Sequence, residues 1–166
     1  MSDSGAFGVN WRKAFNTDTV PSLPAKLGDL GHSPEGTFIF CKAAEAITQY
    51  DFVSIKDDFT IVQMDNTEAA ITPRYYGACQ VGLATNEYAW VWIGGEAGGG
   101  AGKGIKGRFI NYIAKATVYT TATGGVCDDA SGGSFVKLPL VLGLTTVGGT
   151  AAAAELQSWD LLRLSN

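Results

Sequence analysis

The clearest pattern of apolar and polar positions lies in residues 76–95, YGACQVGLATNEYAWVWIGG. Residues 78–84 are apolar apart from Gln80, residues 88–93 are apolar throughout, and the polar residues 85–87 separate the two runs. Runs of this length, rich in β-branched and aromatic residues and joined by a short polar segment, are typical of two strands and a turn. The rest of the chain is expected to be organised around this hairpin.

The second of these strands is apolar on both faces. Successive strand side chains point to opposite faces, so alternate residues belong together. One face carries an aromatic row, Tyr88, Trp90 and Trp92, and the other carries Ala89, Val91 and Ile93. One face can pack into the core of the domain, whereas the aromatic row must be covered by a second sheet, a partner subunit or a ligand.

Short strand-like segments separated by glycine and aspartate turns recur from residue 37 onward. They lie at 37–42, 51–56, 59–64, 108–114, 118–121, 126–127, 136–144 and 150–164. Between them, 65–73 is expected to be a loop or an edge strand, and the glycine-rich segment 94–107 a mobile surface loop. The pattern predicts an all-β domain over 37–166, either a compact β-sandwich or a small β-barrel.

Residues 1–36 have a different character, with prolines and glycines and little alternation. The aromatic residues Phe7, Trp11 and Phe15 are spaced four residues apart, which would place them on one face of a helix. The prolines at 21, 24 and 34 favour an extended chain after them. We expect an extended N-terminal arm that binds a neighbouring protein, or else lies on its own domain or forms a partly disordered tail. The first alternative is preferred, and its docking residues would be Phe7, Trp11, Phe15, Val20 and Leu23.

Composition removes several classes of partner. The chain has 166 residues, a formal net charge of -4 and a pI near 4.9, with no basic run, so nucleic acid is not an expected partner. Its polar start does not resemble a secretory signal, and no apolar run is long enough to span a membrane. Cys41, Cys79 and Cys127 are expected as buried free thiols, although one disulfide and one free thiol would also fit.

Candidate catalytic groups are few. The only histidine, His32, lies in a loop rich in proline and glycine. Paired aspartates at 57–58 and 128–129 stand at strand ends, where aspartate commonly forms turns. Residues 102–107 match GxGxxG, but the sequence after them does not predict the helix that a pyrophosphate site needs. No metal-ligand spacing is present, so we expect no enzyme activity, no cofactor and no metal.

The aromatic row offers two functions. Flat rings along a strand can stack on sugars, which suggests a carbohydrate-binding surface module. Such a stripe is more often buried under a second sheet or at a subunit interface, where tyrosine and tryptophan are enriched. Because few polar residues nearby could bind sugar hydroxyls, Tyr88, Trp90 and Trp92 are predicted to lie in packing or a subunit interface, with carbohydrate binding as the alternative.

Several segments resemble one protein family. They are AITQYDFVSI at 46–55, GACQVGLA at 77–84, EYAWVWIGG at 87–95, AKATVYTTATGGVCDD at 114–129 and LGLTTVGGTAAAAEL at 142–156. Together they are similar to the capsid decoration, or cement, proteins of tailed bacteriophages over roughly residues 36–162. The chain departs from the family pattern in its glycine-rich insertion and its long aromatic arm.

The resemblance implies a structural virion protein that has no catalytic residues. It would be a compact β domain, commonly a homotrimer, made in the host cytoplasm and bound to the outer surface of the assembled head. There it would contact the major capsid protein at junctions between subunits and stabilise the shell. Bridging neighbouring subunits raises the effective concentration of each further contact, and binding only the assembled state favours that state.

Overall fold

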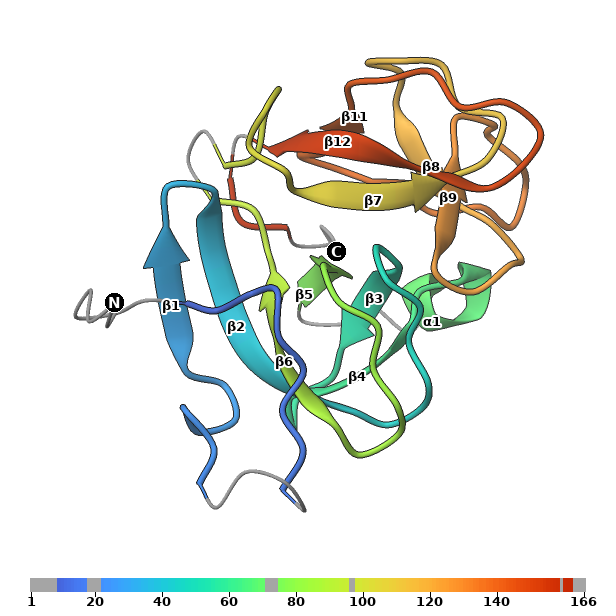
Figure 1. Ribbon diagram of the computed structural model, residues 1–166. Coiled ribbons are helices and arrows are strands. Elements are labelled where there is room, and N and C mark those ends of the chain that lie inside the picture. Colours follow the sequence, from blue (N-terminus) through green and yellow to red (C-terminus); the bar gives the residue numbers. More distant parts are fainter. Residues whose placement is uncertain (1–8, 18–21, 71–74, 96–97, 159, 163–166) are drawn as a thin grey trace.

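The computed structural model describes residues 9–17, 22–70, 75–95, 98–158 and 160–162, and the regular secondary structure within them is almost entirely β-strand (Figure 1). The strands are β1 (Leu30–Ser33), β2 (Gly36–Ala43), β3 (Phe52–Ile55), β4 (Thr60–Gln63), β5 (Tyr75–Cys79), β6 (Tyr88–Trp92), β7 (Lys106–Phe109), β8 (Val118–Thr120), β9 (Val126–Asp128), β10 (Lys137–Leu138), β11 (Val141–Gly143) and β12 (Ala152–Ser158), with one short helix, α1 (Asn66–Ala70). That helix is too short to cross a membrane, and no other helix occurs in the described ranges.

The first sheet closes into a small barrel. Its strands follow the order β1-β2-β4-β3-β5-β6, and β6 pairs back with β2, so β2, β4, β3, β5 and β6 form a ring with β1 attached to the edge of β2. β2 runs parallel to β4, and the other pairings are antiparallel. The all-β prediction and its small-barrel alternative are therefore confirmed.

The second sheet repeats the connectivity of the first. Its order is β10-β8-β9-β7-β12-β11, in which β7 is parallel to β9 and antiparallel to β12, as β2 is to β4 and β6. Equivalent registers also agree: Cys79 faces Val91 across β5 and β6, and Gly143 faces Leu156 across β11 and β12. The chain is thus a tandem of two related β units, which the sequence analysis did not detect because few side chains are shared between them.

Isolated bridges strengthen the correspondence. Ile47 bridges Leu83 in the first unit, and Tyr112 bridges Val147 at the matching place in the second. The second unit differs in being open between β10 and β11, where Pro139 and Leu140 interrupt the strand and Leu140 has a φ of 70°. A proline breaks a β ladder because it has no N–H to donate, and the strand expected over 136–144 is therefore divided into β10 and β11.

Each unit fills its interior with a different set of side chains. The first barrel encloses small and β-branched residues from every strand, among them Ile39, Cys79 and Val91. The second contains the larger rings of Phe109 and Tyr112, whose centroids lie 4.2 Å apart. Gly143, the counterpart of Cys79, makes room for them: an added Cβ would lie 2.7 Å from Tyr112 and 3.1 Å from Phe109. One glycine therefore lets the same backbone pattern hold a different core.

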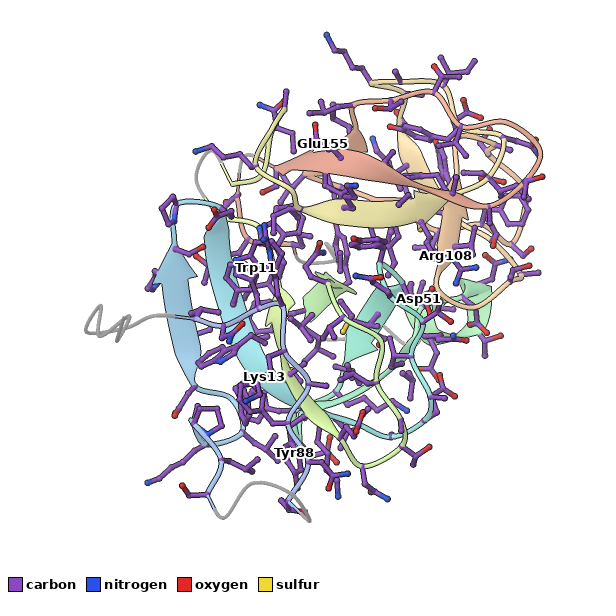
Figure 2. The ribbon with its side chains drawn as sticks, in the orientation of Figure 1. Trp11, Lys13, Asp51, Tyr88, Arg108 and Glu155 are labelled. Atoms are coloured by element: carbon purple, nitrogen blue, oxygen red, sulfur yellow. The ribbon has the colours of Figure 1, made fainter. Side chains whose placement is uncertain are left out.

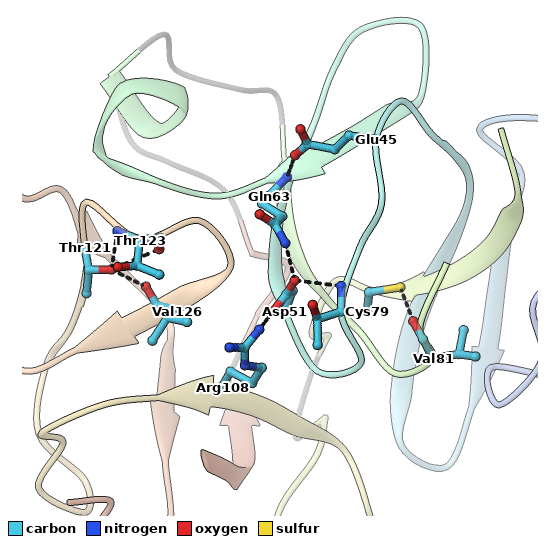
Figure 3. A network of polar contacts seen from close by, with 10 residues as sticks. Glu45, Asp51, Gln63, Cys79, Val81, Arg108, Thr121, Thr123 and Val126 are labelled. Carbon is cyan, nitrogen blue, oxygen red and sulfur yellow. Dashed lines mark hydrogen bonds and ion pairs between the residues drawn. The ribbon is translucent and has the colours of Figure 1, made fainter. Parts of the chain in front are cut away.

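A buried polar cluster ties the two units together (Figure 3). The Arg108 guanidinium on β7 donates to the Asp51 carboxylate at 2.5 Å, and that carboxylate is wholly buried. The other Asp51 oxygen accepts from the Gln63 amide and the Thr48 backbone N–H, each at 2.8 Å. Phe52 donates its backbone N–H to Gly125, so backbone bonds cross the same joint. A buried charge held by this many donors fixes the relative position of the units.

Several strand boundaries follow the sequence. The hairpin of β3 and β4, the turn at 85–86, β6, β8 and the closing strand β12 all lie where the alternation predicts them. The first hairpin strand was placed too late, since β5 ends at Cys79 and residues 80–84 form an irregular segment with a bridge at Leu83.

The prediction of a loop or edge strand over 65–73 was wrong where it can be compared, because α1 begins at Asn66. Asp65 caps the helix: its side chain accepts from the backbone N–H groups of Thr67 and Glu68, both at 2.8 Å. The aspartate followed three residues later by glutamate is a helix-start signal that the sequence contained. Pro73 lies outside the described residues.

The prediction of a mobile surface loop over 94–107 was wrong for most of the described segment, in which only residues 101–103 are exposed. Gly94, Gly95, Gly98 and Gly99 are buried between the two units. Gly99 donates to the Glu35 carbonyl at 2.7 Å, and an added Cβ there would lie 2.3 Å from the Leu156 carbonyl oxygen. Glycine is required because the backbones approach too closely for any side chain, not because the segment must move.

Candidate functional site: the arm and the aromatic row

The aromatic row has the arrangement predicted from its alternation. Tyr88, Trp90 and Trp92 belong to β6 and pack on the side of the barrel wall that faces the arm and the second unit, whereas their alternate neighbours Ala89, Val91 and Ile93 fill the barrel interior. The Phe40 ring lies 5.1 Å from Trp90 and 6.1 Å from Tyr88 between centroids. The two apolar faces of β6 therefore face two different clusters within one chain.

The N-terminal arm covers this row. Figure 2 shows the arm, with Trp11 and Lys13 labelled, passing β6. Phe15 and Tyr88 exchange backbone hydrogen bonds in both directions at 2.8 Å, which adds Phe15 to the edge of β6. The Phe15 ring meets Phe40 edge-on at 6.0 Å, and the Trp11 ring stacks on Phe38 at 6.2 Å. Trp11 is 9% exposed and Phe15 7% exposed. The arm is part of the hydrophobic core of its own domain.

This placement corrects the preferred expectation for the arm. Trp11 and Phe15 were expected to reach a neighbouring protein, but both are buried against their own chain, as in the alternative left open above. Leu23 is half-buried against the same cluster, and Phe7 and Val20 lie outside the described residues. The C-terminal part of the segment also joins the sheet as β1, which the sequence did not predict.

The tryptophans of the row have little surface to offer a ligand or a second subunit. Trp92 is fully buried and donates its indole N–H to the Glu35 carbonyl at 2.9 Å, while Trp90 is 8% exposed. A sugar stacks on an exposed ring face, so these two rings cannot form the carbohydrate platform in this conformation. The prediction of packing is correct for both rings, and the apolar area that seemed to require a partner subunit is already covered.

The exposed apolar surface lies elsewhere. In the described residues, large apolar side chains are exposed at Leu27 (38%), Leu30 (55%), Leu140 (40%) and Ile113 (64%). Leu27 and Leu30 are close in sequence, around a turn in which Lys26 and Asp29 hydrogen-bond each other, and they lead into β1. Among the residues that the structure describes, β1 pairs only with β2. We call Leu27, Leu30 and the free side of β1 the docking edge.

The thiols have no arrangement that suggests catalysis. All three cysteines are buried and free, as expected from their strand contexts. Burial raises the pKa of the Cys79 thiol to about 12, and it raises the pKa values of Cys41 and Cys127 well above their ordinary range. The thiolate is the nucleophilic form, so these groups are unreactive near neutral pH. No group of three metal-ligating side chains is found in the described part of the chain.

The aspartate pairs form turns, as predicted. Asp58 accepts from the Thr60 hydroxyl at 2.6 Å and from its backbone N–H at 3.0 Å, and these hydrogen bonds lower the pKa of the Asp58 carboxyl. Asp128 accepts from the backbone N–H of Ala130, and Asp129 from that of Ile113. His32 is exposed, with its Nδ1 3.2 Å from the Thr37 hydroxyl and no carboxylate bonded to it among the described residues.

Comparison with known protein families, with curated proteins and with solved structures gives no match for this chain. The resemblance to phage decoration proteins therefore rests on the short segments quoted above.

Proposed function

We propose that this protein is a structural virion protein that decorates the outer surface of a tailed-phage head and stabilises it by contacting the major capsid protein. The observation that carries the proposal is the docking edge, which combines two exposed leucines close in sequence with a strand that pairs on one side only among the described residues. The resemblance of five segments to decoration proteins supplies the identity of the partner.

An open strand edge favours association with an extended segment of another protein. Its unpaired N–H and C=O groups can be completed by a partner strand, and alternate side chains then supply specificity. Leu30, the first residue of β1, has more than half of its surface in water, so contact with the shell would bury apolar area that the isolated chain leaves exposed. This assignment replaces Trp11 and Phe15 as the shell contacts.

Homotrimer formation stays part of the proposal, without the aromatic row as its contact. Trp90 and Trp92 are covered within the chain, and Tyr88 is half-buried under the arm and near Lys42, whose Nζ lies 5.9 Å from its ring. Self-association would use other surface, and its measurement by light scattering is independent of the test of head binding.

Co-sedimentation with purified expanded heads and with unexpanded procapsids tests the proposal. The protein should saturate expanded heads, and Leu27→Glu combined with Leu30→Glu should weaken binding by about tenfold or more, because interface anchors contribute most of the affinity. Ile113→Glu is the control, since Ile113 is even more exposed than the two leucines but lies on the second unit.

Two results would contradict this assignment. Failure of the wild-type protein to sediment with heads would remove the decoration function itself. Equal binding by the Leu27→Glu, Leu30→Glu variant and the wild type would keep the function but reject the docking edge.

A further inference from the structure

A polar cleft lies where the arm meets both β units. It has a volume of about 340 Å³ and is lined by Trp11 and Arg12 from the arm, Gln49, Tyr50 and Gln80 from the first unit, and Gly104 and Lys106 from the segment leading into and starting β7. Ligand sites often form at such junctions, where separate segments converge, and a volume of a few hundred Å³ suits a small ligand.

The floor of the cleft is held in place by a carboxamide. Gln80 is 2% exposed; its Oε1 accepts from the Lys106 backbone N–H at 2.9 Å, and its Nε2 donates to the Lys106 carbonyl at 2.9 Å. Gln49 donates from Nε2 to the Gln80 carbonyl at 3.1 Å. These bonds fix the start of β7 and the backbone of Lys106 against the first unit, so the cleft is formed before any ligand arrives.

Two cations are positioned over aromatic rings of the cleft. The Arg12 guanidinium carbon lies 4.3 Å from the centre of the Trp11 ring, and the Lys106 Nζ lies 5.6 Å from that of Tyr50. Ring contacts of this kind hold a charged side chain in place without neutralising it. Within the described residues, neither Arg12 nor Lys106 has a carboxylate within ion-pair distance.

The neighbouring carboxylates are engaged elsewhere. Glu155 faces Lys106 across β7 and β12, but both of its oxygens accept from the Gly102 backbone N–H at 3.1 Å. Asp51 is buried in its contact with Arg108. The lining itself contains no acidic residue, although the chain as a whole is acidic.

We infer that this cleft binds a small anion through its carboxylate or phosphate oxygens, with Arg12 and Lys106 as the charged ligand-binding residues. The planar Arg12 guanidinium presents paired donors that match either group, and the Lys106 ammonium adds a second positive charge to the lining. Arg12 and Lys106 each lie over one face of a lining ring, so we expect the ligand to be held by the two positive charges. This site is separate from the docking edge and does not depend on the proposed function.

Isothermal titration of the full chain at fixed low ionic strength tests the inference with sodium glucuronate, inorganic phosphate and glucose. At least one of the two anions should bind saturably at one site per chain, with a Kd below about 10 mM, and uncharged glucose should not bind. Binding of glucuronate but not phosphate would identify a carboxylate site, and binding of phosphate but not glucuronate would identify a phosphate site.

Charge-neutralising variants then locate the site. Arg12→Gln and Lys106→Gln should each weaken binding by about tenfold or more, since each removes a charge-assisted contact. Lys106→Arg should retain most of the affinity. Lys103→Gln is the matched control, because Lys103 is exposed in the same glycine-rich segment but does not line the cleft.

The inference is rejected if neither anion gives a saturable isotherm. It is also rejected if Lys103→Gln loses as much affinity as the cleft variants, which would indicate diffuse surface charge. Thermal melting of each variant shows whether a loss of binding reflects the site or a loss of the fold.

Discussion

Replacement of Phe15 by alanine tests directly whether the arm is part of the folded core. Phe15 is 7% exposed, and its ring meets the Phe40 ring edge-on at 6.0 Å between centroids. Its backbone exchanges two hydrogen bonds with Tyr88. Truncation of a buried phenylalanine costs about 3–5 kcal/mol through lost burial and the cavity left behind. Because Phe15 lies at the margin of its cluster, we expect the lower end, about 3 kcal/mol.

Urea unfolding followed by tryptophan fluorescence measures this loss in the isolated protein. For a chain of this length, a loss of about 3 kcal/mol corresponds to a fall in Tm of about 6–12 °C. Asn10→Ala is the control, since Asn10 is exposed on the same arm and its truncation should change the stability by less than about 0.5 kcal/mol.

The opposite result has a clear meaning. If the arm instead docks on a neighbouring protein, Phe15→Ala would leave the unfolding free energy of the isolated chain within about 0.5 kcal/mol of the wild type. An unchanged midpoint and slope would refute the intramolecular packing, and the arm would again be a candidate for contact with the shell.

Three further outcomes follow from the joint and the buried groups. Asp51→Ala should cost about 3 kcal/mol, because Arg108 then lacks its partner, and Arg108→Met in the same chain should restore part of this in chemical denaturation. Ellman's reagent at pH 8 should find no reactive thiol until denaturant is added. Because burial raises the pKa of Cys79 in the folded protein to about 12, the protonated thiol's contribution to stability is fully present below pH 9. That contribution is lost as the pH rises toward 12. Gly99→Ala should destabilise the fold by more than about 3 kcal/mol, because the added Cβ would clash with the Leu156 carbonyl oxygen. Gly102→Ala is the control: its φ is similar but the space around it is open, so it should cost about 1 kcal/mol. Equal losses in the two variants would show that only the backbone φ matters.

Local pattern was sufficient for much of the β architecture. The alternation in β6 correctly divided its side chains between two faces, and the turn signals placed the β3–β4 hairpin and β12. The helix-start signal at Asp65 was also present in the sequence, and its neglect accounts for the missed α1. These features depend on residues within a few positions of one another, which is why they can be read from the chain alone.

The contacts between distant segments could be decided only by the tertiary structure. The sequence required that the rings of the arm and of β6 be covered, but it could not show that they cover each other, since Phe15 and Tyr88 meet through chain closure over a long separation. The same holds for Gly99, whose lack of a side chain permits close packing instead of motion. Composition specifies which groups must leave water, and only the fold determines which partner each of them finds.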